Sequence, residues 1–111
     1  MIKGVHAMFN SPKAEELRAF IRDKLEFDYT DVGDGWLIFS PPEAEVGCHP
    51  ADGTSHEISF YCDDIEKTVA ELNERGVEFT TEITDAGFGL ITDFRLPDGS
   101  EVQLYQPKYS R

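Results

Sequence analysis

The sequence predicts an α+β fold in which two βαβββ modules form a curved mixed sheet with a cleft and carry their helices on the outer face. The first observation behind this prediction is an internal repeat. Residues 5–27 and residues 57–79 each contain an alternating apolar run, a residue able to cap a helix, a helical pattern and a closing Glu-Phe pair. A repeat near half the chain length indicates two similar modules whose matching positions converge where they meet.

The second observation is length and composition. A chain of 111 residues with 40% hydrophobic residues is typical of one globular domain. We therefore expect a single domain at residues 1–111, with modules at residues 1–50 and 56–111. The breaker-rich segment PADGTS, residues 50–55, is the expected linker.

The first module is expected to open with a strand at residues 3–10, where apolar and polar side chains alternate. Ser11 and Pro12 favour a helix start, because Ser can cap a helix and Pro fits its first position. A helical apolar stripe follows, and the glycine-rich turn at residues 33–35 leads into expected strands at residues 36–40 and 45–49.

The second module repeats this order. In its first strand, Ile58, Phe60 and Cys62 face one way and Glu57, Ser59 and Tyr61 the other. Asp63 is the expected helix cap, with Glu66 completing a capping box, and Gly76 is the expected stop. Three further strands are expected at residues 78–83, 87–96 and 101–106, the last two joined by a turn at residues 97–99.

The charge of the chain restricts its partners. A formal net charge of −12 disfavours nucleic acid and anionic membrane surfaces and leaves small molecules as the expected ligands. An acidic coat that keeps the protein soluble is the simpler explanation of the charge itself. Cys48 and Cys62 fit two buried thiols in a reducing compartment, with a disulfide as the alternative. No apolar run is long enough to span a membrane, so we expect a cytoplasmic protein.

Several strings of the sequence resemble the vicinal-oxygen-chelate superfamily, which includes glyoxalase I, extradiol dioxygenases, fosfomycin-modifying enzymes and bleomycin-binding proteins. They are His6 in the first strand, FIRDKLEF at residues 20–27, the segment at residues 63–79, and LPDGSEVQL at residues 96–104. The resemblance covers nearly the whole chain. It implies the same two-module fold and, in many members, a divalent metal such as Fe, Zn, Mn or Ni in the cleft.

By position, the metal-ligand slots of that superfamily fall on His6, Gly47, Glu57 and Gln103. His6 matches a usual ligand, whereas Glu57 stands where histidine is commoner, Gln103 where glutamate is commoner, and Gly47 has no ligating side chain. Because side chains alternate along a strand, a displaced ligand set with Glu101, and with His49 as a further candidate, is the alternative. For His6, Glu57 and Glu101 an ordinary polar role remains open, and for His49 a loop-edge role.

Two functions compete at this point. In the first, the protein is a metal-dependent enzyme of lyase or dioxygenase type, with Glu57 or Glu101 as ligand or general base and the ion as a Lewis acid. In the second, it is a metal-free protein that binds a cationic or planar small molecule, as bleomycin-binding proteins do. Side chains expected to line the substrate pocket are Trp36, Ser59, Tyr61 and Tyr105. A homodimer is expected from the resemblance, and the cleft could form within one chain or across two.

Overall fold

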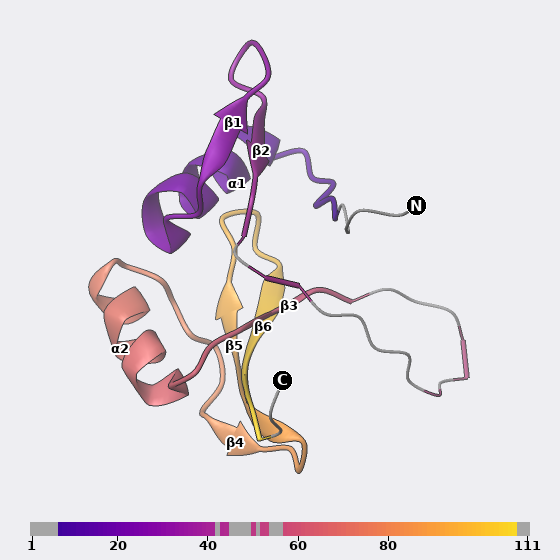
Figure 1. Cartoon of the computed structure of the whole chain (residues 1–111), viewed down its shortest axis with the longest axis vertical. Helices are drawn as coiled ribbons and strands as arrows, with labels where there is room; N and C mark the ends of the chain where they lie inside the picture. Colours follow the sequence, from indigo (N-terminus) through magenta and orange to yellow (C-terminus); the bar gives the residue numbers. More distant parts are fainter. Residues whose placement is uncertain (1–6, 42, 45–49, 51, 54–56, 109–111) are drawn as a thin grey trace.

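The computed structural model describes residues 7–41, 43–44, 50, 52–53 and 57–108. These residues form two helical segments and two separate sheets (Figure 1). The α+β class is therefore confirmed. Within the described residues the strands form one two-stranded and one four-stranded sheet rather than a single sheet.

The first module contributes α1 (Ala14–Phe20), a π-helical turn η1 (Ile21–Leu25) and the antiparallel hairpin β1 (Tyr29–Asp31) and β2 (Leu37–Phe39). The hairpin turn needs left-handed backbone at Gly33, Asp34 and Gly35, which explains its two glycines. Ser11 does not cap α1: its hydroxyl accepts a hydrogen bond from the Lys13 backbone N–H, before the helix begins.

Two strands expected in the first module lie partly or wholly outside the described residues. The described part of the first, residues 7–10, belongs to no strand. The strand expected at residues 45–49 lies outside the described residues. The hairpin strand β1 was not expected from the sequence.

The second module follows the strand, helix and three-strand order in full. It contains β3 (Ser59–Tyr61), α2 (Ile65–Glu74), β4 (Thr84–Asp85), β5 (Gly89–Arg95) and β6 (Glu101–Pro107). Its sheet has the order β3-β6-β5-β4, with β3 parallel to β6 and the other pairs antiparallel. The strand expected at residues 78–83 is reduced to an isolated bridge between Phe79 and Phe94, and β4 begins after it.

The cap of α2 differs from the prediction by one residue. Asp64, not Asp63, is the N-cap, and its carboxylate accepts a hydrogen bond from the Lys67 backbone N–H. Two adjacent aspartates give the same sequence signal, and the backbone of the preceding strand decides which one caps. Gly76 follows the helix with φ of 86°, as the expected stop requires.

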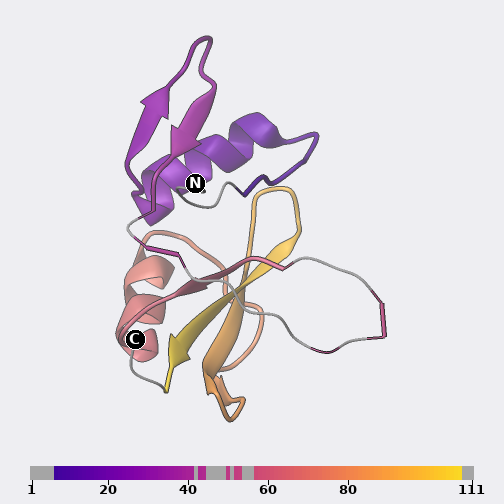
Figure 2. The same ribbon diagram turned by 45° about the vertical axis from the view of Figure 1, so that its right-hand side comes forward.

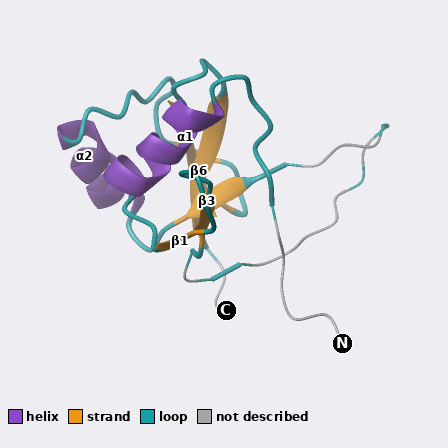
Figure 3. Cartoon of the chain, turned by 90° about the horizontal axis from the view of Figure 1, so that it is seen from above, coloured by secondary structure: helices purple, strands orange, loops and turns teal. Residues whose placement is uncertain are grey.

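Both helices pack on one face of the four-stranded sheet (Figure 2, Figure 3). The core contains Leu17 from α1, Ile65 and Leu72 from α2, and Phe94 and Leu104 from the sheet. Phe94 is 0% exposed. One face of the sheet is therefore the core, and the opposite face is left for a site. No helix in the described ranges is long and apolar enough to cross a membrane.

Candidate functional site

The open face of the four-stranded sheet carries the side chains that alternate with the core residues. The strand register places Ser59 beside Gln103, and Gln103 beside Asp93. It also places Tyr61 beside Tyr105. Their neighbours Phe60 and Leu104 pack into the core, so the predicted facing of β3 is confirmed.

Part of this face is a groove of about 420 Å³, which we call the acidic groove. Its polar lining consists of Glu57, Ser59, Asp93, Glu101 and Gln103, and its apolar lining consists of Ile58, Val102 and, from the first module, Phe9. Four of the residues expected at the site therefore lie in one groove. They come from β6 and from the segment that contains β3.

Hydrogen bonds hold two of these side chains in place. The Ser59 hydroxyl donates to Oε1 of Gln103 at 3.2 Å, and the Thr80 hydroxyl donates to Oε1 of Glu101. Glu57 and Asp93 form no ion pair with any described lysine or arginine. The groove thus combines two tethered polar groups with carboxylates that have no cationic partner in the described part of the chain.

Asp93 is a groove residue that the sequence reasoning did not single out. The signal was available, because a residue of β5 at this position shares a face with Gln103 once the antiparallel register is known. That register depends on the turn between β5 and β6, so the sequence alone did not place Asp93 beside the predicted residues.

Beside the acidic groove lies a row of three rings, Tyr61, Tyr105 and Phe88, which we call the aromatic row. The ring centroids of Tyr61 and Tyr105 are 6.1 Å apart, and those of Tyr105 and Phe88 are 6.0 Å apart. Both spacings are within the range of favourable aromatic contacts. The Tyr61 hydroxyl donates to Oε2 of Glu43 at 2.6 Å, which links this row to the end of the first module.

Comparison of the chain with protein-family models shows which family it belongs to. The family model "Glyoxalase/Bleomycin resistance protein/Dioxygenase superfamily" matches residues 4–104. The chain belongs to this superfamily. The resemblance found in the sequence is thereby confirmed.

Solved structures of the superfamily resemble the chain along most of its length. TnmS3, described as an antibiotic binding protein from Streptomyces sp. CB03234, is 27% identical, with 88% of each chain covered and a TM-score of 0.65. A member of the superfamily from Sphaerobacter thermophilus is 26% identical, with 95% of this chain and 98% of that chain covered and a TM-score of 0.64. Lactoylglutathione lyase from Agrobacterium tumefaciens shares the fold at 15% identity, with 86% of each chain covered and a TM-score of 0.62. No curated protein sequence matches the chain.

The structure describes some of the ligand positions implied by the superfamily and not others. Glu57, Glu101 and Gln103 line the acidic groove, whereas His6 and His49 lie outside the described residues. Among the described side chains, no group of three or more His, Cys, Asp or Glu residues is arranged to hold a metal ion.

Trp36 is the expected pocket residue that lies apart from the others. It stands at the turn before β2, is 51% exposed, and packs against Arg18, whose guanidinium carbon is 4.5 Å from the ring centroid. It lines neither the acidic groove nor the aromatic row. A pocket role for Trp36 stays a prediction.

Proposed function

We propose that this protein binds a planar, cationic small molecule on the open face of its four-stranded sheet without transforming it. The observation that carries this proposal is that the aromatic row lies directly beside the acidic groove. Tyr105 of the row and Gln103 and Glu101 of the groove occupy consecutive outward positions of β6. Tyr105, Gln103 and Glu101 alternate along that strand, so a stacking surface and a carboxylate lie about 14 Å apart or less.

The charges of the groove support a cationic ligand. Glu57, Asp93 and Glu101 bring three carboxylates to one groove, and the net charge of −12 adds a field that attracts cations. Flat rings stack on Tyr and Phe side chains, and a positive charge on the ligand is further favoured by their ring faces. The similarity to TnmS3, described as an antibiotic binding protein, agrees with binding as the function.

Calorimetric titration with proflavine and acridine tests the charge requirement. Both are flat three-ring molecules, but at neutral pH proflavine is a cation and acridine is largely uncharged. We expect proflavine to bind more tightly than acridine. The double variant Glu57→Gln and Asp93→Asn should weaken proflavine about two- to thirtyfold, at about 0.2–1 kcal/mol for each of the two exposed charge pairs.

Two controls make this result interpretable. Glu74→Gln removes one negative charge from α2, away from the groove, and should leave proflavine affinity unchanged. Acridine affinity should change little in the double variant. Equal affinities of proflavine and acridine for the unmodified protein would contradict the proposal.

A metal-dependent enzyme of lyase or dioxygenase type is the second candidate, and one observation favours it. Phe9 lies in the same groove as Glu57 and Glu101, and His6 precedes Phe9 by three residues. The candidate ligands are His6, Glu57 and Glu101, with Gln103 and His49 as further candidates. Among the described residues the donors form no group of three or more that could hold a metal ion, so this candidate needs His6 or His49. The hydrogen bonds that Gln103 and Glu101 accept from Ser59 and Thr80 leave further lone pairs on both side chains.

Metal content of protein purified without a histidine tag tests this second candidate. After chelation and dialysis, Fe(II), Zn(II), Mn(II) or Ni(II) should bind at one equivalent per chain and raise the melting temperature. His6→Ala and Glu57→Ala should each abolish the uptake, and Glu74→Ala should preserve it. If none of the four ions binds stoichiometrically or raises the melting temperature, the metal-dependent candidate is wrong.

The expected homodimer also belongs to this proposal. The β1–β2 hairpin exposes Tyr29, Val32 and Trp36, which are 47%, 62% and 51% accessible. Exposed apolar residues of this size on one hairpin are typical of a surface that another chain covers. A partner chain seated on this hairpin would support the prediction that the cleft is completed across a dimer.

A further inference from the structure

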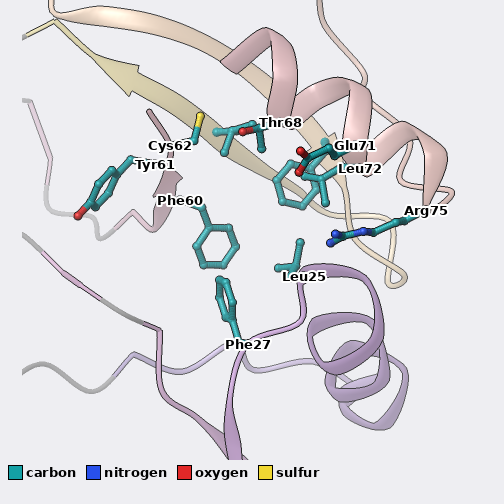
Figure 4. A pocket seen from close by; sticks show the side chains of 11 residues that line it. Leu25, Phe27, Phe60, Tyr61, Cys62, Thr68, Glu71, Leu72 and Arg75 are labelled. Atoms are coloured by element: carbon teal, nitrogen blue, oxygen red, sulfur yellow. The ribbon is translucent and has the colours of Figure 1, made fainter. Parts of the chain in front are cut away.

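A second cavity lies on the opposite side of the sheet from the acidic groove, between the end of η1, strand β3 and helix α2 (Figure 4). Its volume is about 220 Å³. For comparison, a dry engineered protein cavity of about 150 Å³ binds benzene. The cavity is therefore large enough for one aromatic ring with a short substituent.

Aromatic and other uncharged side chains form one wall of this helix-side cavity. Phe27 meets Phe60 edge to face at 5.4 Å, and Phe60 stacks over Phe94 at 6.4 Å. Cys62 directly follows β3 and lines the cavity, and burial raises the pKa of its thiol, so the thiol stays neutral at pH 7. This wall favours an aromatic ring over a polar group.

The facing wall is one stripe of α2 and is partly polar. Thr68, Glu71, Leu72 and Arg75 recur at helical spacing along the cavity. In Figure 4, Glu71 and Arg75 lie on the side of the helix that faces Phe60 and Leu25. A helix stripe that packs against an aromatic wall is normally apolar throughout, so these two charged residues are unusual.

The two charges do not neutralise each other. Glu71 and Arg75 have the four-residue spacing of a helical ion pair, but Arg75 instead donates to the Lys24 carbonyl at 2.9 Å and pairs with Glu26 at 3.2 Å. Glu71 has no ion-pair partner among the described residues. An uncompensated carboxylate therefore stands at the edge of an aromatic cavity.

We propose that the helix-side cavity is a second ligand site, which takes a small aromatic amine with its ring against Phe27 and Phe60 and its ammonium group at Glu71. The site lies on the core side of the sheet and shares no residue with the acidic groove, although Tyr61 of the aromatic row also borders it. Arg75 fixes the mouth of the site by joining α2 to the end of η1.

Titration of the ¹⁵N-labelled full chain with 2-phenylethylamine tests this site, with 2-phenylethanol as the uncharged analogue. We expect the amide signals of Phe27, Phe60 and Glu71 to shift, and the amine to bind three- to fivefold more tightly than the alcohol. Glu71→Gln should remove that preference. Glu74→Gln, the same change one position outside the stripe, should keep it.

A second variant tests the cavity rather than the charge. Leu25→Phe adds a ring to the cavity lining and should weaken the amine and the alcohol by the same factor. Asp93→Asn, in the acidic groove, should change neither affinity. Equal binding of amine and alcohol to the unmodified protein, or shifts confined to residues of the acidic groove, would overturn the proposal.

Discussion

Replacing Phe94 with alanine should lower the free energy of unfolding by about 3–5 kcal/mol, the largest effect expected for a single substitution in this chain. Phe94 is 0% exposed and is the ring about which the core is arranged. It stacks with Phe20 at 6.3 Å and Phe60 at 6.4 Å, and it contacts Phe79 at 5.5 Å. Its removal would leave a cavity between α1, β3 and β5 that none of these elements can fill without moving.

Urea denaturation provides the measurement, with the midpoint reporting stability and the slope reporting the surface exposed on unfolding. Phe88→Ala is the matched control, because Phe88 is 54% exposed and its loss should cost far less. If the two variants were equally stable, Phe94 would not occupy the core position described.

This core shows why the second module was easier to predict than the first. Phe60 alternates with Ser59 and Tyr61 on a strand with one buried face, so periodicity alone placed it on the core side, where the structure has it. Gly76, after α2, and Gly99, in the turn before β6, both take the positive φ that glycine favours. Local pattern and tertiary packing agree over this half of the sequence.

The first module departs from the prediction where tertiary contacts override local signals. The helix that follows Lys13 changes to a π-helical turn at Ile21, and Glu26 then ends it with a left-handed φ of 59°. Arg75, from the other module, binds the carbonyl of Lys24 and the carboxylate of Glu26 at this point. A contact with a residue about 50 positions away is invisible to any local pattern.

The candidate site was predictable in its residue types but not in its full composition. Alternation placed Glu57, Ser59, Glu101 and Gln103 on one face, and the structure brings them into one groove. Asp93 and the tether from Thr80 to Glu101 depend on strand register and on the irregular segment before β4. These contacts are decided by how strands meet, which a single sequence does not specify.

The last prediction concerns the aromatic row, the part of the site that a flat ligand would contact. Tyr105→Ala should weaken proflavine binding by about 1–3 kcal/mol, roughly five- to 150-fold, because Tyr105 is the central ring between Tyr61 and Phe88. The rings of Tyr61 and Phe88 are inclined to that of Tyr105 by 52° and 67°, so Tyr105 is the ring on which a flat ligand would stack, and its removal leaves two separate rings. The same titration used for the acidic groove measures the change.

The charge and stacking contributions can then be separated. Tyr105→Phe retains the ring and should bind proflavine nearly as well as the unmodified protein, whereas Tyr29→Ala removes an exposed ring from the β1–β2 hairpin and should have no effect. Tyr105→Ala should weaken acridine as strongly as proflavine, because stacking does not require the charge. A loss of proflavine affinity in Tyr29→Ala comparable to that in Tyr105→Ala would move the binding surface from the sheet to the hairpin.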